Sequence, residues 1–429
     1  MDIKKGQTLV IARHAYFEVK DKEVVCLSEK YGYWVKISKE CYNMVQNAVK
    51  EGLSIDEFVA LFVDEEDRVY ISKLISKLQE AHVLISNGEN DDNITLEHVD
   101  IMMTERCNLS CKHCGASAVK VNDEEYFDTL EMKSILDKVI SCKPKVIVFT
   151  GGEPLLREDI FELLGYVKSK GDIQINLMTN GTLINENNVK DIVESINSID
   201  ISMDGYDEES CSYVRGKGVF NNVCNSIMLL REVSDIPISL SMVSLNQSAT
   251  EEFKFKELCK QLNVKSAIRR LSYSGRAKEN WKYLNSKEQE NTILPENFKR
   301  ENPTYQELKG ELKACTCKGG VSSFSIDSTG KIYPCAAFSE ITSEIGNIKD
   351  IDDLAKFLNS EELENSKGMK TLMDYSPYGN KICKECDVRY FCWTCPHIAY
   401  EIASDKELLK KTCNGKKEYL RRLVWGTSF

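Results

Sequence analysis

The sequence predicts an α/β protein: an open (β/α)6 partial barrel with a smaller domain before it and a cysteine-rich domain after it. Three observations predict this class. Between residues 97 and 275, six apolar strand patterns alternate with helical patterns. Before residue 95, short strand patterns precede helical ones, and after residue 310 the chain holds many of its 17 cysteines. Its 429 residues are enough for two or three domains.

The composition is that of an ordinary globular protein, 42% hydrophobic and 29% charged. The net charge is −11 and no long run of Lys and Arg occurs, which argues against nucleic-acid binding. The chain lacks an apolar window long enough to span a membrane, and Met1–Gln7 is polar, unlike a secretory signal. We therefore expect a cytoplasmic protein that binds neither nucleic acid nor membrane.

Residues 1–95 predict a separate winged-helix-like domain. Three strand patterns and then three helical patterns occur in it: Thr8–Val19, Glu23–Ser28, Tyr33–Ser38, Lys39–Glu51, Ser54–Phe62 and Arg68–Ala81. Ser54 can cap the second helix, with Glu57 at the reciprocal capping-box position. Val83–Ser86 can return as a wing strand. A DNA-binding winged helix is the alternative, which the net acidic charge of this segment weakens.

Residues 97–275 carry the alternation that predicts the barrel. The strand candidates are His98–Met103, Lys145–Phe149, Ile173–Met178, Ser198–Met203, Pro237–Val243 and Lys265–Leu271. The helical patterns between them are Leu130–Ser141, Glu158–Lys168, Asn185–Ile196, Val219–Glu232 and Thr250–Leu262. Such alternation favours a parallel sheet with right-handed crossovers. Ligands of these sheets bind at the carboxyl ends of the strands.

Three cysteines follow the first strand candidate. Cys107, Cys111 and Cys114 stand in a C-x3-C-x2-C spacing. Three thiolates leave one coordination position empty, which is a defect for structural zinc because a closed tetrahedron needs four ligands. For a [4Fe–4S] cluster the empty position is useful, since the fourth iron can hold an exchangeable ligand. We expect His113, before the third cysteine, to pack beside this cluster.

The ends of the next strands are also candidates for ligand binding. Lys145–Thr150 runs into Gly151-Gly152-Glu153-Pro154, where two glycines allow a ligand to approach the backbone. Their carbonyls, with the Glu153 carboxylate, can accept from an ammonium group. Asn180 ends the third strand, Ser202 ends the fourth, and Arg215 follows in Val214-Arg215-Gly216. Plain turns are the alternative, because Asn-Gly and Asp-Gly favour positive φ.

The C-terminal cysteines suggest two further metal sites. They are Cys315, Cys317, Cys335, Cys383, Cys386, Cys392, Cys395 and Cys413. Their number suits two four-ligand sites, and two zinc knuckles are an alternative reading of the C-x2-C pairs. Ser325–Cys335 predicts a hairpin that turns at Ser328-Thr329-Gly330. We expect the other six cysteines to be buried as small apolar residues: Cys26, Cys41, Cys142, Cys211, Cys224 and Cys259.

These motifs resemble known families over nearly the whole chain. The C-x3-C-x2-C spacing followed by Gly-Gly-Glu-Pro resembles the radical SAM superfamily. The C-terminal order resembles the SPASM extension, with one departure: two residues separate Cys392 and Cys395 instead of three. The N-terminal pattern resembles the RiPP recognition element, which is related to the peptide chaperone of PQQ biosynthesis. Gly275-Arg276-Ala277 resembles a common exit from the last barrel strand.

The resemblance implies S-adenosylmethionine and three [4Fe–4S] clusters as cofactors. Cys107, Cys111 and Cys114 would hold the first cluster. The inner auxiliary cluster would use Cys317, Cys335 and Cys395, with Cys315 as an uncertain ligand, and the outer one Cys383, Cys386, Cys392 and Cys413. Gly151, Gly152, Glu153 and Pro154 would receive the amino group of S-adenosylmethionine. Asn180 would lie near its ribose, and Ser202 and Arg215 near its carboxylate.

The resemblance also implies a domain plan and a function. Residues 1–95 would bind a leader peptide, 97–275 form a partial TIM barrel, 276–309 bridge, and 310–429 form the SPASM domain. The expected activity is that of a maturase which cross-links a ribosomally made precursor peptide, preferably through a Cys thioether as in sactipeptide and ranthipeptide enzymes. A flavodoxin- or ferredoxin-type donor would supply electrons. No catalytic acid or base is assigned.

Three alternatives stay open for the function, while a tetrapyrrole-modifying radical SAM enzyme is disfavoured because it would not need a strand-rich leader-binding domain. A carbon–carbon (Lys–Trp type) peptide cyclase would also remove two electrons from its substrate. A sulfatase-maturase-like enzyme has the same clusters, but the position of its base after the G-x4-C cysteine is Ala336 here. The non-enzyme alternative is an iron–sulfur electron carrier or peptide-binding scaffold, which would not cleave S-adenosylmethionine.

Overall fold

A computed structural model describes most of the chain: residues 8–86, 96–120, 124–245, 249–284, 286, 312–339, 341, 344–392, 395–403 and 406–426. Two compact units are present. The first comprises Met1–Asn93, Asn302–Lys318 and Thr371–Phe429, and the second Ile94–Glu301 and Gly319–Lys370. Most of the expected bridging region 276–309, from residue 287 onward, lies outside the described residues. No helix of the described residues is long and apolar enough to cross a membrane.

The second unit contains the predicted parallel sheet. Its six strands, in spatial as well as chain order, are β6 (His98–Met102), β9 (Val146–Thr150), β10 (Gln174–Thr179), β11 (Ser198–Ser202), β12 (Ile238–Ser244) and β13 (Lys265–Arg270). Each pairs in parallel with the next. The six strand predictions are confirmed to within about a residue at each end, so the carboxyl ends of all six strands lie at one edge of the sheet.

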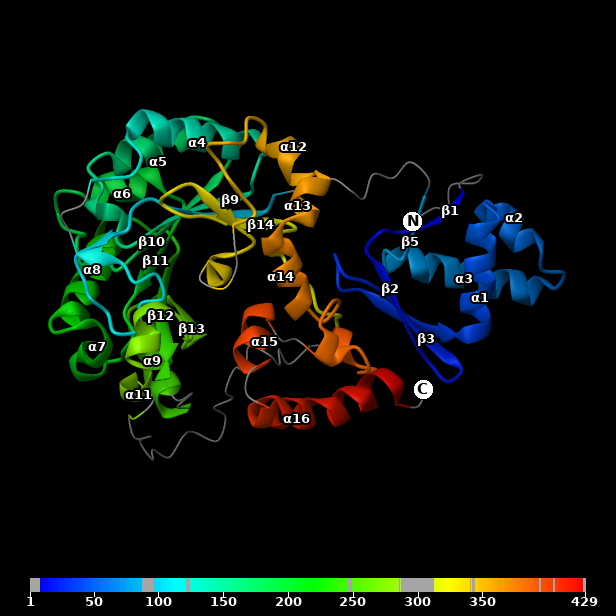
Figure 1. Ribbon diagram of the computed structural model, residues 1–429. Helices are drawn as coiled ribbons and strands as arrows, with labels where there is room; N and C mark the ends of the chain where they lie inside the picture. The colour runs from blue at the N-terminus through cyan, green and yellow to red at the C-terminus, as the bar shows by residue number, and fades with distance from the viewer. Residues whose placement is uncertain are drawn as a thin grey trace. The chain divides into compact units, whose positions relative to one another are not determined.

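Helices connect these strands and cover the outer face of the sheet (Figure 1). Those predicted from the sequence are α4 (Thr129–Ser141), α5 (Ile160–Lys168), α6 (Val189–Ser195), α8 (Val219–Val233) and α9 (Ala249–Gln261). A further helix, α7 (Glu208–Arg215), was not predicted. It has only eight residues and buries Ser210, Cys211 and Val214, so it offers too few apolar positions for the repeat on which a helix prediction depends.

The sheet continues past β6, on the side away from β9. Strand β14 (Ser323–Ile326) pairs in parallel with β6, and β15 (Lys331–Tyr333) and β16 (Gly346–Asn347) follow antiparallel. The hairpin between β14 and β15 is the predicted one, and Gly330 adopts φ +86° in its turn. The sequence does not predict that this hairpin extends the barrel sheet, because the pairing joins residues more than 200 positions apart.

The first unit begins with a small antiparallel sheet and three helices. The sheet has the order β2 (Ala15–Lys20), β3 (Glu23–Ser28) and β4 (Trp34–Ser38). Its helices are α1 (Lys39–Lys50), α2 (Ile55–Ala60) and α3 (Glu65–Glu80). The capping box of Ser54 and Glu57 is present at the start of α2, as predicted. The expected single strand Thr8–Val19 is instead broken: β1 (Leu9–Ile11) leaves the sheet and pairs with β5 (Leu84–Ser86).

The C-terminal part of the first unit contains little regular structure around its cysteines. Two short 3-10 turns, η4 (Lys381–Cys383) and η5 (Arg389–Phe391), are followed by α15 (Pro396–Ala403) and α16 (Lys406–Trp425). Val388, Tyr390 and Phe391 of this region share an apolar cluster with β3 of the N-terminal sheet. The N-terminal domain and this C-terminal segment therefore have a common core.

Candidate active site

The predicted cysteine loop leaves the barrel sheet directly after β6. Strand β7 (Arg106–Cys107) pairs in parallel with β8 (Val119–Lys120), which closes the loop at its base. Cys107 and Cys111 are buried, and Cys114 is half-buried. Burial raises the pKa of the Cys107 and Cys111 thiols because it disfavours the thiolate. Thiolates in this loop therefore need a positively charged neighbour, such as a metal.

Helix α10 (Gly275–Glu279) holds this loop from one side. The Arg276 amide donates to the Cys114 carbonyl over 2.9 Å, and its guanidinium donates to the carbonyls of Cys111 (3.0 Å) and Ala118 (2.6 Å). Gly275 adopts φ +48°, and a Cβ there would lie 2.5 Å from the Cys114 carbonyl oxygen. The Gly-Arg-Ala segment that the sequence indicates as a barrel exit thus packs directly on the cysteine loop.

The Gly-Gly-Glu-Pro turn lies against the strand that leads to the cysteines. The Gly152 amide donates to the Thr104 carbonyl and the Glu153 amide to the Arg106 carbonyl, each over 2.8 Å. A Cβ on Gly152 would lie 2.2 Å from the Arg106 carbonyl oxygen. The second glycine is therefore required by the close approach of two backbone segments, whatever ligand the turn binds.

Glu153 is fully buried and joins two strand ends. Its carboxylate accepts from the Thr179 hydroxyl (2.7 Å), the Asn180 amide (2.7 Å) and the Leu155 amide (3.1 Å). Burial raises the pKa of Glu153, and these hydrogen bonds to the carboxylate oppose the rise. Both carboxylate oxygens accept from the protein, so Glu153 first of all fixes the end of β10 against the end of β9.

Asn180 lies beside the first cysteine. Its side-chain amide donates to the Asn108 side chain over 2.8 Å and is 3.9 Å from the Cys107 sulfur. Its side-chain oxygen accepts from the Thr182 amide over 2.9 Å. At the next strand end, the Ser241 hydroxyl donates to Ser202 over 3.4 Å. These strand-end residues, which the sequence predicts as ligand contacts, are on the same edge of the sheet as the cysteine loop.

The sequence does not predict a cluster of buried charged side chains that lies next to the cysteine loop. Asp204 Oδ2 lies 2.6 Å from Arg215 Nε and 2.9 Å from His113 Nε2. Burial alone would raise the pKa of Asp204, but the charges of Arg215 and His113 outweigh it and lower that pKa. Arg215 Nη1 lies 3.8 Å from the Cys111 sulfur. Arg215, a candidate ligand contact from the sequence, therefore places a positive charge beside a thiol.

His113 lies within the cysteine loop and contacts Asp204; that it packs beside a cluster stays a prediction. Its Nδ1 is buried and has no hydrogen-bond partner within the described residues. The sequence gives no signal for the Asp204 contact: Asp204 stands in an Asp-Gly pair that is typical of a turn, and it does adopt a positive φ of 57°. A turn aspartate gives no local indication that its carboxylate is buried against residues of two other segments.

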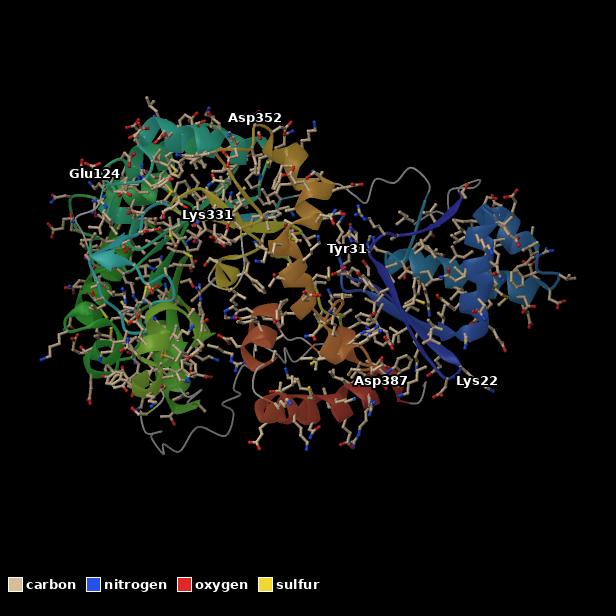
Figure 2. The ribbon with its side chains drawn as sticks, viewed as in Figure 1. Lys22, Tyr31, Glu124, Lys331, Asp352 and Asp387 are labelled. Carbon is tan, nitrogen blue, oxygen red and sulfur yellow. The ribbon has the colours of Figure 1, made fainter. Side chains whose placement is uncertain are left out.

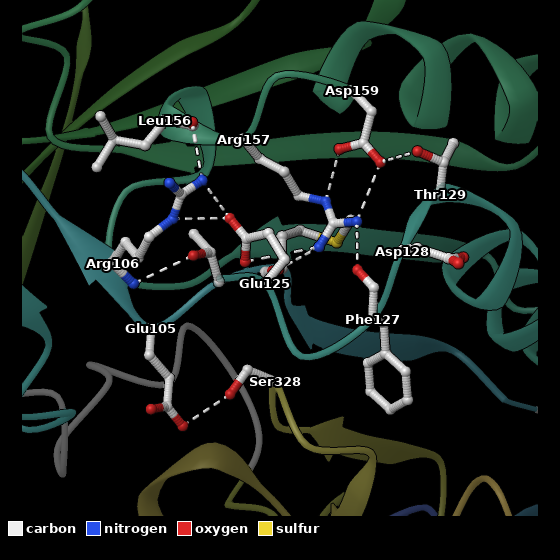
Figure 3. A network of polar contacts seen from close by, with 12 residues as sticks. Glu105, Arg106, Glu125, Phe127, Asp128, Thr129, Leu156, Arg157, Asp159 and Ser328 are labelled. Atoms are coloured by element: carbon white, nitrogen blue, oxygen red, sulfur yellow. Dashed lines mark hydrogen bonds and ion pairs between the residues drawn. The ribbon is translucent and has the colours of Figure 1, made fainter. Parts of the chain in front are cut away.

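A second charge network lies beneath the loop and was missed by sequence reasoning (Figure 3). Arg157, three residues after Pro154 of the Gly-Gly-Glu-Pro turn, is 3% exposed. It donates to Asp159 (2.7 Å) and to the carbonyls of Met103 (3.1 Å) and Phe127 (2.9 Å). Glu125 pairs with Arg106, the residue before the first cysteine. This network connects the cysteine strand with the turn after β9.

The same strand is also tied to the β14–β15 hairpin. The Ser328 hydroxyl donates to Glu105 over 2.8 Å, as Figure 3 shows. Ser328 belongs to the turn that the sequence predicts, and Glu105 stands two residues before Cys107. The hairpin before Cys335 and the strand before the first cysteine are therefore linked within the second unit.

The C-terminal cysteines are divided between the two units. Cys335 follows β15 in the second unit, and the other seven are in the first. Cys413 is on α16. Burial, followed by the neighbouring thiols of Cys392, Cys386 and Cys413, raises the pKa of Cys383 to about 11. These four thiols, predicted as one ligand set, are thus close enough to influence one another.

Cys315 is built into the same part of the first unit. It is 6% exposed, and its amide donates to the Tyr390 carbonyl over 2.6 Å. Its carbonyl accepts from the Tyr378 hydroxyl, also over 2.6 Å. Tyr390 stands two residues before Cys392, so the backbone of Cys315 is fixed beside a cysteine predicted for the outer cluster.

The donor chemistry of both cysteine groups fits iron–sulfur clusters, since each offers several thiols. No three His, Cys, Asp or Glu side chains of the described residues converge in a metal-ligand geometry. The buried, unpartnered nitrogen of His113 beside the first group is a further feature that fits a polar group at this position.

Comparison with known families agrees with the motifs. The radical SAM superfamily matches residues 101–253, and the iron–sulfur cluster-binding SPASM domain matches residues 315–387. By sequence, the chain is 29% identical to the AdoMet-dependent heme synthase of Methanosarcina barkeri over 333 residues, which cover 71% of this chain and 92% of that protein.

Two solved structures have a similar fold. Streptococcus suis SuiB bound to S-adenosylmethionine matches with a TM-score of 0.53 and 16% identity, over 92% of this chain and 97% of SuiB. Native anSMEcpe with bound AdoMet matches with a TM-score of 0.50 and 20% identity, over 74% of this chain and 99% of that one. At these identities the likeness establishes the fold.

The two matched domains also decide the cofactors. A radical SAM domain followed by a SPASM domain implies S-adenosylmethionine and several [4Fe–4S] clusters. The zinc alternative for the C-terminal cysteines and the non-enzyme alternative are both disfavoured by this finding. The chain is a radical SAM enzyme with a SPASM domain.

Proposed function

We propose that this enzyme is a maturase that installs a cross-link in a ribosomally synthesised precursor peptide, with a Cys thioether as the preferred product. The observation that carries the proposal is the N-terminal domain in front of the barrel. Its three-stranded sheet ends in β4, which pairs on one side only, with β3, among the described strands. An open strand edge can receive an extended peptide as an added strand.

The comparison with SuiB supports an N-terminal domain of this fold. About 8% of the chain, or about 34 residues, is left uncovered by that match, which is fewer than the 79 residues from Thr8 to Ser86. The breadth of this match supports a shared N-terminal domain. We propose that residues 1–95 bind the leader of the precursor, which brings the remainder of the peptide to the barrel.

The cofactors supply the radical. With S-adenosylmethionine bound at the cluster that Cys107, Cys111 and Cys114 would hold, the cofactors would supply radical chemistry able to take one hydrogen atom from a peptide carbon. Joining that carbon to a cysteine sulfur would release the thiol proton and one electron. The clusters held by the C-terminal cysteines would supply a sink for this electron, so the peptide would lose two hydrogens overall. A flavodoxin- or ferredoxin-type donor supplies the electron that cleaves S-adenosylmethionine.

The residues of the chain have positioning roles in this scheme. Cys107, Cys111 and Cys114 hold the cluster that binds S-adenosylmethionine. The Gly151–Pro154 turn, Asn180, Ser202 and Arg215 hold S-adenosylmethionine itself. Their support is that they lie at one edge of the sheet with the cysteine loop: Asn180 is 3.9 Å from the Cys107 sulfur and Arg215 is 3.8 Å from the Cys111 sulfur.

The placement of Cys315 favours the thioether over a carbon–carbon bond. Its backbone is bonded to Tyr390 and it is buried beside the outer ligand set. We propose that the Cys315 thiol does not ligate the inner auxiliary cluster, which would then have Cys317, Cys335 and Cys395 as its ligands. A cluster with three cysteines has an iron that can bind a substrate thiolate and lower the pKa of that thiol.

Mass spectrometry of the treated precursor tests the proposal. The purified, anaerobically reconstituted enzyme is incubated with S-adenosylmethionine, a reductant and the peptide encoded beside it. We expect a loss of two hydrogens and one cysteine that iodoacetamide no longer alkylates under reducing conditions. The same mass loss with every cysteine still alkylated would instead support a carbon–carbon cross-link. An unchanged peptide would contradict both.

Tetrapyrrole modification is a second candidate, favoured by the sequence likeness to a heme synthase. It leaves the N-terminal domain with its open strand edge unexplained. Incubation of the reconstituted enzyme with an iron-porphyrin carboxylate separates the two functions. Decarboxylated porphyrin together with 5′-deoxyadenosine would establish the tetrapyrrole activity, whereas our proposal predicts an unchanged porphyrin.

A further inference from the structure

Strand β3 of the N-terminal sheet is buried on both faces. Val24 and Cys26 point to one side and belong to the core formed with helices α1 and α3. Val25 and Leu27 alternate with them and belong to a second core, formed with Val388, Tyr390 and Phe391. All four strand residues are at most 1% exposed. The uninterrupted apolar sequence of β3 is therefore explained by two partners, its own helices and the C-terminal region.

The C-terminal partner is the loop between two predicted cluster ligands, Cys386 and Cys392. The apolar residues of this loop, Val388, Tyr390 and Phe391, are at most 3% exposed. The two cysteines at its ends pack at the margin of the same apolar cluster. The N-terminal sheet thus covers the segment that sets the position of one cysteine relative to the other.

Ion pairs and hydrogen bonds surround this apolar contact. Glu18 on β2 lies 3.1 Å from Arg389, and Lys20 lies 2.9 Å from Asp387, which is labelled in Figure 2. The indole of Trp425 donates to the Asp387 carbonyl over 2.8 Å. Two of the residues between Cys386 and Cys392 are therefore held by side chains of the N-terminal sheet.

The segment before Cys315 is held by the same sheet. The Ala314 amide donates to the Gly32 carbonyl over 2.8 Å, and the Trp34 indole donates to the Leu312 carbonyl. Gly32 adopts φ +71°, and a Cβ there would lie 2.8 Å from the Ala314 carbonyl oxygen. The turn between β3 and β4 therefore needs a glycine at position 32, because the backbone of Ala314 lies so close to it.

We propose that the N-terminal sheet is a structural component of the outer auxiliary cluster site, Cys383, Cys386, Cys392 and Cys413. It fixes the loop between Cys386 and Cys392, which determines whether the two thiols have the spacing that a cluster needs. The N-terminal domain thereby has a role in cluster retention besides any binding of a leader. This role rests on the SPASM cofactors and on the proposed ligand set, and it is independent of the substrate.

Two adjacent valines of β3 provide a matched test in the full-length protein. Val25→Ala removes methyl groups from the core shared with the cysteine loop, and Val24→Ala removes the same groups from the core shared with the helices. Both side chains are 0% exposed. The measurement is the rate at which a chelator removes iron from the reconstituted enzyme, without any peptide, together with the electron paramagnetic resonance of the reduced clusters.

We expect Val25→Ala to release about four irons about tenfold faster than the wild type, a change of about 1.4 kcal/mol. Val24→Ala should lower the thermal midpoint of unfolding about as much as Val25→Ala does, but it should keep the wild-type rate of iron release. Equal release by the two variants, or release by Val25→Ala at the wild-type rate, would overturn the proposal. Because no peptide is present, neither result depends on the maturase function.

A milder pair of variants covers the case in which Val25→Ala does not fold. Lys20→Met removes the ion pair between the sheet and Asp387 of the cysteine loop. Lys36→Met removes an ion pair with Glu23 that lies within the sheet itself. Faster iron release by Lys20→Met but not by Lys36→Met supports the proposal, and identical release by both contradicts it.

Discussion

Several charged groups around the cysteine loop are buried, and each is paired. Asp204 is held by Arg215 and His113, and Arg157 by Asp159 and two backbone carbonyls. An unpaired charge in such a place would cost several kcal/mol, so removal of one partner is expensive. These pairs fix the strand ends at which the cofactor would bind. Their loss should therefore lower the free energy of unfolding, which can be measured without an assay of activity.

The Arg157 network gives a direct prediction. Arg157→Ala leaves Asp159 without its buried partner and two carbonyls without a donor, so we expect a loss of about 3–5 kcal/mol in the free energy of unfolding. Lys133→Ala, which breaks the surface pair with Glu162, should cost at most about 1 kcal/mol. Chemical denaturation of both variants measures the difference. Equal losses would show that the Arg157 network is not structural.

Glu29 predicts a pH dependence of stability. Burial raises its pKa to about 7, against a hydrogen bond from Tyr16. Because the folded state keeps a proton that the unfolded state loses at its ordinary pKa, stability falls as pH rises from about 4.5 to about 7. Glu29→Gln should remove up to about 3 kcal/mol of this dependence. Urea denaturation at pH 5 and pH 8 measures the free energy of unfolding of both proteins. The stability of Glu29→Gln relative to the wild type should be higher at pH 8 than at pH 5. An equal difference at the two pH values would refute the assignment.

At the scale of elements, α10 and the cysteine loop form one assembly through Gly275. Gly275→Ala places a Cβ against the Cys114 carbonyl at a positive φ. We expect S-adenosylmethionine cleavage to fall by about tenfold to hundredfold, with loss of iron from the first cluster. Gly52→Ala, also at positive φ but with open space around it, should affect only stability, by about 1 kcal/mol.

The result is measured as 5′-deoxyadenosine formed by the anaerobically reconstituted variants. If Gly275→Ala cleaved S-adenosylmethionine at the rate of Gly52→Ala, the close contact between α10 and the loop would be irrelevant to the cluster.

The sequence predicts the elements whose pattern is local. The six barrel strands have apolar β-branched cores between helical patterns, and the capping box at Ser54 is visible within four residues. The break in Thr8–Val19 was missed because β1 pairs with β5: the sequence predicts a strand at Val83–Ser86 but does not show which strand it pairs with. Helix α7 was missed because it has only eight residues, of which Ser210, Cys211 and Val214 are buried, too few for a clear apolar repeat.

The candidate site divides in the same way. Cysteine spacing and the Gly-Gly-Glu-Pro turn are visible in the sequence. The partners of Asp204, Arg157 and Glu105 are not, because each pair joins segments that only the folded sheet brings together. Pairing between charged residues of different segments leaves no periodic signal in the chain.

For the whole molecule, the order of the compact units differs from the order of the chain. The N-terminal domain belongs with the last cysteines, and the β14–β15 hairpin belongs with the barrel. Removal of residues 1–95 would expose the residues of the C-terminal core that Val25 and Leu27 cover, and it would also remove any leader site. Variants of the precursor leader are therefore a cleaner test of leader binding than truncation of the enzyme.

Iron content tests the number of clusters in the intact chain. The cysteine groups predict about twelve irons per chain after anaerobic reconstitution, in three [4Fe–4S] clusters. Replacement of Cys107, Cys111 and Cys114 by Ala should remove about four irons and all cleavage of S-adenosylmethionine. A triple variant that still made 5′-deoxyadenosine would show that the first cluster is elsewhere.

Hydrogen transfer from the peptide to the cofactor tests directly whether this enzyme acts on a peptide. The precursor is prepared with deuterium on its carbon atoms and incubated anaerobically with the reconstituted enzyme, S-adenosylmethionine and a reductant. We expect 5′-deoxyadenosine that carries one deuterium, in an amount equal to the peptide that has lost two hydrogens, and no transfer from a precursor without its leader. Abundant 5′-deoxyadenosine without deuterium, beside an unchanged peptide, would contradict the claim that this enzyme acts on a peptide.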